Sequence, residues 1–156
     1  MTKQERLQKA WHHFDDKAGH LPTGTRQACE WAVQAGLLDL PEIDPYDVLA
    51  EQMAAALRAE YETDSRGRRY RVNHAVRISR AGVQYTFWAM MGFAPHDHME
   101  KAFAQRREQI VGDCVQLKID VDAYNEMREP GTDTLQLVLD FTDDVAEREQ
   151  DFGRAA

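Results

Sequence analysis

Six arginines lie close together in one part of the sequence, and their side chains could bind phosphate. Between Arg66 and His96 the chain has six arginines and no lysine, aspartate or glutamate, although its net charge is −8. This stretch therefore carries +6 and the rest of the chain carries −14. A guanidinium group is planar and presents a fork of N–H donors that fits two phosphate oxygens. The segregated charge indicates either a surface for a polyanion or an exposed face that acids elsewhere in the chain neutralise.

An alternating pattern predicts that several of these arginines share one face of a strand. Residues 69–78 place basic or polar side chains mostly at odd positions and apolar ones mostly at even positions, as a half-buried strand does. Residues 83–90 form a second predicted strand. If residues 79–82 close a hairpin, Ile78 opposes Val83 and the apolar side chains of both strands share a face. With the flanking arginines, the predicted nucleic-acid-binding residues are Arg66, Arg68, Arg69, Arg71, Asn73, Arg77, Arg80 and Trp88.

The histidines and cysteines match no motif for metal binding or catalysis. The six histidines form no signature such as HExxH, and there is no G-x-S-x-G motif or phosphate-cradling glycine loop. Cys29 and Cys114 belong to no CxxC pair, and free cysteines are among the most buried residues. We therefore expect a non-enzymatic protein with no metal, no cofactor and two buried thiols.

Helical patterns precede and follow the predicted hairpin. Apolar residues recur at helical spacing over residues 2–17, from about 25 to 35, and from 45 to 61. Asp97 and Glu100 have the spacing of a capping box at the start of a long helix that ends near residue 128. The predicted fold class is α+β and mainly helical.

The order of helix, helix, helix, hairpin and long helix resembles that of winged helix-turn-helix DNA-binding proteins. The resemblance covers residues 2–90, and it implies that the third helix enters the major groove while the hairpin contacts the phosphate backbone. Two features depart from the family pattern: residues 35–44 make a long connection, and the third helix is acidic, which would repel phosphate. The predicted organisation is a winged-helix-like domain over 1–95, a long helix over 96–129 and an acidic tail over 130–156.

The long predicted helix has a narrow apolar seam. Phe103, Ile110, Leu117 and Tyr124 are seven residues apart, the spacing of a coiled-coil seam. Only two heptads are regular, because Arg107 interrupts the first half. The 103–124 seam could join two copies of the chain, or it could pack on the chain's own domain.

The acidic C-terminal segment contains a possible partner-binding motif. From Asp120 to Asp151 there are 11 acids and two arginines. Residues 136–141, QLVLDF, resemble the QLxLxF motif by which bacterial replication and repair proteins bind the sliding clamp. The resemblance implies that Gln136 bonds at the rim of the clamp pocket while Leu139 and Phe141 fill it, with Leu137 beside them. The alternation of Leu135, Leu137, Leu139 and Phe141 also fits a strand or a packed tail.

Together these patterns predict a non-enzymatic DNA-binding protein with a regulatory or replication role in a mobile or accessory element. The Arg-rich hairpin would contact the DNA backbone without sequence specificity. The alternative is a protein-interaction adaptor that acts through its acidic C-terminal segment, with the sliding clamp as a candidate partner. The chain has no apolar run long enough to span a membrane, and we expect a cytoplasmic location.

Overall fold

Two helices that pack on each other form the first of two units. The computed structural model describes residues 1–154, with side chains to residue 151, and its contacts divide the chain into units Met1–Leu49 and Ala50–Ala156. Helix α1 (Lys3–Lys17) begins with a capping box between Thr2 and Glu5, which stabilises a helix start by pairing two otherwise unbonded N–H groups. Phe14 of α1 packs on Trp31 of α2 (Thr25–Gln34), with ring centroids 5.8 Å apart.

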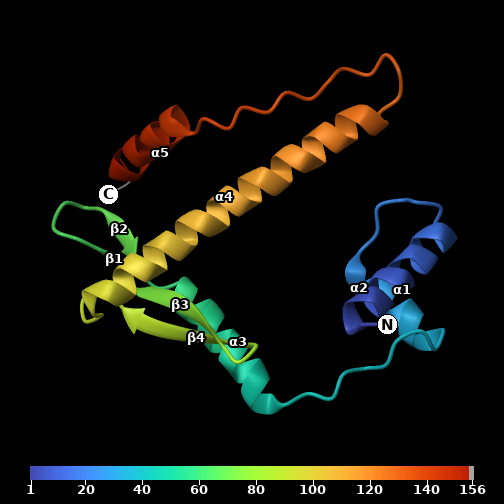
Figure 1. Cartoon of the computed structure of the whole chain (residues 1–156), viewed down its shortest axis with the longest axis horizontal. Helices are drawn as coiled ribbons and strands as arrows, with labels where there is room; N and C mark the ends of the chain where they lie inside the picture. Colours follow the sequence, from blue (N-terminus) through green and yellow to red (C-terminus); the bar gives the residue numbers. More distant parts are fainter. Residues whose placement is uncertain (155–156) are drawn as a thin grey trace. The chain divides into compact units, whose positions relative to one another are not determined.

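The second unit is built on two consecutive antiparallel hairpins (Figure 1). Helix α3 (Pro45–Arg58) extends into it from the unit boundary and is followed by β1 (Tyr61–Thr63), β2 (Arg69–Arg71), β3 (Asn73–Arg80) and β4 (Val83–Met90). Strand β1 pairs with β2, and β3 pairs with β4. The prediction of an α+β chain with a hairpin is confirmed. The third helix is shorter than predicted, because Tyr61 belongs to the short strand β1.

The predicted single strand over 69–78 changes partners at Val72. The Val72 N–H donates to the Glu60 carbonyl at 3.1 Å, and the Val72 carbonyl accepts from the Met91 N–H at 2.7 Å. Val72 therefore connects the two hairpins. Only 4% of its surface is exposed, so this junction lies in the core.

The register of the β3–β4 hairpin differs from the predicted one by two residues. Arg80 opposes Val83 and Ile78 opposes Tyr85, so the turn contains only Ala81 and Gly82 instead of four residues. Both have positive φ, 50° and 77°, as the two central residues of a type I′ turn require. A shift of two residues leaves every side chain on its predicted face, because the side-chain period of a strand is two.

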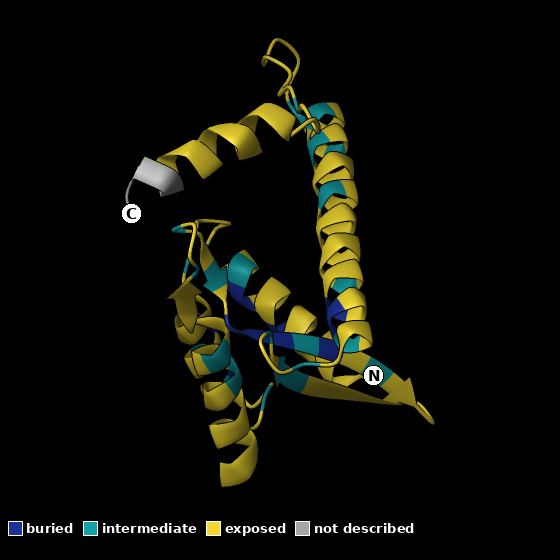
Figure 2. Ribbon diagram, turned by 90° about the vertical axis from the view of Figure 1, so that its left-hand side faces the viewer, coloured by how far each residue is buried: buried dark blue, intermediate teal, exposed yellow. Residues whose placement is uncertain are grey.

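The core of the second unit lies between β3 and the beginning of α4 (His96–Met127), as the dark blue segments of Figure 2 show. His74 and Val76 are each 3% exposed, and Ala102 of α4 is fully buried. Helix α4 begins after Pro95, and no side chain caps its first turn. The predicted capping box is therefore wrong: Asp97 lies inside the first turn.

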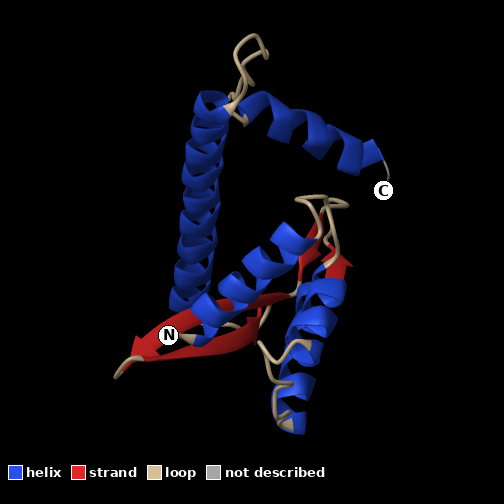
Figure 3. Ribbon diagram, turned by 90° about the vertical axis from the view of Figure 1, so that its right-hand side faces the viewer, coloured by secondary structure: helices blue, strands red, loops and turns tan. Residues whose placement is uncertain are grey.

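Helix α4 continues beyond the hairpins, and the chain then returns through an irregular segment to a last helix (Figure 3). Residues 132–141 form no strand, and α5 (Thr142–Arg154) follows them. The strand considered for this segment is absent, and α5 was not predicted.

Within residues 1–154, no helix is long and apolar enough to cross a membrane. Cys29 is exposed and Cys114 half-buried, so the expectation of two buried thiols is wrong.

Candidate nucleic-acid interface

Four arginines from four different elements line one small pocket of the second unit. Arg58 comes from α3, Arg71 from β2, Arg77 from β3 and Arg106 from α4. The pocket has a volume of about 140 Å³. The other side chains on its wall are polar or aromatic for the most part, and the full remaining set is Asn73, His74, Ala75, Thr86, Trp88, Gln105 and Gln109.

No carboxylate lines this pocket. Among the residues with described side chains, Arg26, Arg68 and Arg107 are the arginines within ion-pair distance of an acid, and none of them lies on the pocket wall. The four pocket guanidinium groups therefore repel one another without a neutralising acid within 4 Å. Such a site favours an anion with several oxygens, because each guanidinium can donate two parallel hydrogen bonds.

The strand that carries Arg77 is held in place by Gln105 of α4. The Gln105 Oε1 accepts from the Arg77 N–H at 2.8 Å, and the Gln105 Nε2 donates to the Arg77 carbonyl at 2.9 Å. One side-chain amide thus makes the two hydrogen bonds that a neighbouring strand would make. This pair of bonds fixes the distance between β3 and the part of α4 that carries Arg106.

A second set of contacts holds the end of α3 against the hairpin. Asn73 is 6% exposed, and its Nδ2 donates to the Leu57 carbonyl at 3.2 Å and to Glu60 Oε1 at 2.8 Å. The Arg58 guanidinium lies over the Trp88 ring, 5.4 Å from its centroid, a cation–π arrangement. Asn73 and Trp88 therefore position the pocket wall on the α3 side.

His74 is a buried part of the same wall. Its Nε2 lies 2.8 Å from the Arg71 carbonyl, and because a carbonyl only accepts, Nε2 carries the proton. Burial lowers the pKa of His74 below its usual 6.5, and the charges of Arg106 and Arg71 lower it further. His74 is therefore neutral at pH 7 and orients the backbone of Arg71 without adding charge to the pocket.

The structure brings four of the eight residues predicted for nucleic-acid binding together: Arg71, Asn73, Arg77 and Trp88 line the pocket. The other four lie outside it. Arg66 and Arg68 belong to the β1–β2 turn, Arg69 lies over the Tyr61 ring at 4.3 Å, and Arg80 ends β3. The Arg68 Nε donates to Asp64 at 2.6 Å, so its charge is already paired. Hydrogen bonds from Arg68 lower the pKa of Asp64 and keep that carboxylate ionised.

Sequence reasoning missed the four pocket residues that the hairpin does not supply: Arg58, Gln105, Arg106 and Gln109. Arg58 belongs to an acidic helix, and the other three lie on α4, where the apolar seam was the signal considered. The spacing of Gln105, Arg106 and Gln109 on one turn of helix is a signal for one polar face.

The predicted partner-binding residues lie on the segment between α4 and α5. Asn125 holds the start of this segment, since its side-chain amide exchanges two hydrogen bonds with the backbone of Leu135, at 3.0 and 2.9 Å. Leu139 and Phe141 are 39% and 40% exposed and line a groove along α4. Gln136 and Leu137 line a smaller neighbouring pocket.

Comparison of the chain with protein-family models, with curated proteins and with solved structures gave no match. Within residues 1–151, no three His, Cys, Asp or Glu side chains lie close enough together to hold a metal ion. A functional proposal for this chain therefore depends on the geometry of the arginine pocket and of the α4 groove.

Proposed function

We propose that this protein binds the phosphate backbone of DNA, without enzymatic activity, through the pocket of Arg58, Arg71, Arg77 and Arg106. The observation that supports the proposal is the convergence of four guanidinium groups from four elements on a pocket without a carboxylate. The four arginines are solvent-exposed, so their positive charges are accessible to a ligand, and a bound anion would relieve their mutual repulsion. A phosphodiester supplies that anion, and a guanidinium matches its two free oxygens.

The other pocket residues suit the same ligand. Gln109 and Thr86 provide neutral hydrogen-bond donors, and the Trp88 ring on the same wall already contacts the Arg58 guanidinium. Backbone contacts of this kind give affinity without sequence specificity. Arg66 and Arg80, at the turns of the two hairpins, would extend the contact along the backbone.

The winged-helix-like identity of residues 1–95 belongs to the same proposal. The observed order of three helices followed by hairpins and a long helix supports it. The acidic third helix does not suit entry into the major groove, since phosphates would repel it. In the arrangement that we propose, the hairpin and α4 contact the DNA, and α3 contributes Arg58 at its C-terminal end.

Fluorescence anisotropy with a labelled random duplex tests the proposal on the full chain. If each of four arginines neutralises one phosphate, log K should fall against log salt with a slope of about −3.6. Binding of the duplex with a slope near this value supports the proposal. No binding at 50 mM salt, or an affinity that does not change with salt, would refute it.

A second candidate function is docking to the sliding clamp through residues 136–141. Two observations favour it, because a docking motif must be accessible. Residues 136–141 pair with no strand, and Val138 in the middle of the motif is 73% exposed. Leu139 and Phe141 would have to leave the α4 groove to enter a clamp pocket. Binding of the full chain to immobilised clamp should be lost in Leu139→Ala and Phe141→Ala variants and kept in Val138→Ala. Equal binding by all three variants would exclude the motif.

A further inference from the structure

The chain exposes much more surface than compact proteins of its size do. Its accessible area is 13400 Å², whereas two separate compact bodies with the sizes of its two units would expose about 9,500 Å². Among the described side chains, no large one is fully buried. Large exposed apolar areas mark surfaces that another molecule covers.

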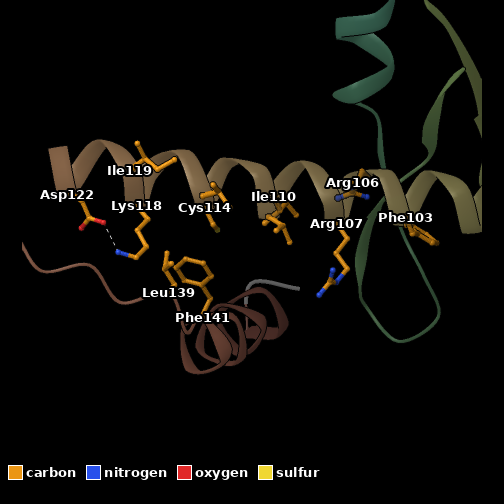
Figure 4. A pocket seen from close by; sticks show the side chains of 12 residues that line it. Phe103, Arg106, Arg107, Ile110, Cys114, Lys118, Ile119, Asp122, Leu139 and Phe141 are labelled. Carbon is orange, nitrogen blue, oxygen red and sulfur yellow. Dashed lines mark hydrogen bonds and ion pairs between the residues drawn. The ribbon is translucent and has the colours of Figure 1, made fainter. Parts of the chain in front are cut away.

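Helix α4 carries a large part of this exposed apolar surface. The four seam residues Phe103, Ile110, Leu117 and Tyr124 are between 46% and 57% exposed. Ile110 and Cys114 lie on the floor of a groove of about 790 Å³, and Leu139 and Phe141 form its opposite wall (Figure 4). The seam and the groove wall together make a surface long enough for a second helix.

The charges of α4 are arranged so that this second helix can be another α4 in the opposite direction. Residues 101–107 hold three cations and no acid, and residues 113–126 hold four acids and one lysine. Antiparallel pairing places the basic part of each helix beside the acidic part of the other. Parallel pairing would instead bring Arg107 of one copy onto Arg107 of the other and align the acidic parts.

One antiparallel register fits most of the seam. It pairs Ile110 with Cys114 of the second copy and Phe103 with Val121 of the second copy, so the seam residues alternate across the contact. The same register places Arg106 beside Asp120 of the second copy, twice in a symmetric dimer. It also places Arg107 opposite Leu117, and Asp113 beside Asp113 at the two-fold axis. The paired stretch from residue 103 to 121 is about 27 Å long.

We propose that the protein is a symmetric homodimer held by antiparallel packing of two α4 helices over the seam. A symmetric contact of this type uses the same surface patch on both copies. The partner helix covers Ile110 and Leu117. Leu139 and Phe141, which line the groove beside the seam, add apolar surface to the contact, since two heptads alone make a short one. This proposal does not depend on DNA binding. Because it pairs Arg106 with Asp120 of the second copy, Arg58, Arg71 and Arg77 are the pocket arginines that stay unpaired in the dimer.

Sedimentation equilibrium of the full chain, without DNA, tests the association. We expect twice the chain mass of 17.9 kDa at micromolar concentration. Ile110→Asp and Val121→Asp should each weaken dimerisation at least tenfold, because each places two acids against uncharged seam residues of the other copy. Val138→Asp, at an exposed apolar residue outside the seam, is the matched control. A monomer for the unmodified chain would overturn the proposal, as would a dimer that all three variants leave intact.

A charge reversal tests the direction of the helices and does not rely on a core substitution. Arg106→Asp and Asp120→Arg should each weaken the dimer, because each places like charges side by side at two positions. The double variant should restore it. Far-UV circular dichroism verifies that each variant keeps its helices. Two weakened single variants without rescue in the double variant would overturn the antiparallel arrangement, as would a disulfide-linked Cys114–Cys114 dimer formed on oxidation of a Cys29→Ser variant.

Discussion

Removing Arg71 and Arg77 together should change the salt dependence of DNA binding by an amount that the structure sets. Arg71 is the last residue of β2 and Arg77 lies on β3, and in the described part of the chain neither has an acid within ion-pair distance. If four arginines each neutralise one phosphate, the slope of log K against log salt is about −3.6, and the variant Arg71→Gln/Arg77→Gln should have a slope of about −1.8.

The corresponding change in affinity is large enough to measure by fluorescence anisotropy. Between 50 and 200 mM salt, the unmodified chain should lose about 150-fold in affinity and the double variant about 12-fold. Arg26→Gln/Lys118→Gln is the matched control, because it removes the same charge from two cations that already pair with Glu30 and Asp122. The pocket assignment fails if the control and the pocket variant have the same slope.

Three further predictions concern the contacts that build the pocket. Asn73→Ala removes the hydrogen bonds that Asn73 donates to Leu57 and Glu60 and should lower the free energy of unfolding by about 1–3 kcal/mol, measured by urea denaturation; an unchanged midpoint would show that these bonds are not needed. Gln105→Ala leaves the Arg77 N–H and carbonyl to bond with water, so urea denaturation should show a free energy of unfolding only about 0.5–1.5 kcal/mol lower. The same variant should bind duplex DNA more weakly in fluorescence anisotropy, because Arg106 is no longer held beside β3. The depressed pKa of His74 means that the unfolded chain binds a proton first as the pH falls below 6.5, so stability should decline from about pH 7 downwards by up to about 1.4 kcal/mol per pH unit, and His74→Gln should flatten this decline.

Periodicity was sufficient to predict the first four helices and the faces of the hairpin, but not α5. The helical spacing over 3–17 and 25–34 and the alternation over 69–78 each reflect a buried side, and burial decides both patterns. The register of the hairpin was wrong because alternation fixes only whether a residue points inward. The length of the turn depends on Ala81, which adopts a left-handed conformation that alanine rarely takes.

The candidate site was predictable only in part, because it combines segments that are far apart in the sequence. Arg71 and Arg77 were found from local charge. Arg58 and Arg106 join them only through tertiary contacts, namely Asn73 with the end of α3 and Gln105 with β3. In the C-terminal segment, the alternation of leucines matched a strand, but no strand pairs with it, and the Asn125 side chain fixes its start instead.

The turn at Ala81 and Gly82 also bears on how the hairpin folds. A two-residue turn of this type is most stable with Asn-Gly, and an alanine with φ of 50° costs about 1–2 kcal/mol. The turn therefore does not favour early hairpin formation, and the ladder must offset its strain. We expect β3 and β4 to pair late, together with the docking of α4 on His74 and Val76. Ala81→Asn should therefore slow unfolding and leave the refolding rate nearly unchanged in stopped-flow experiments.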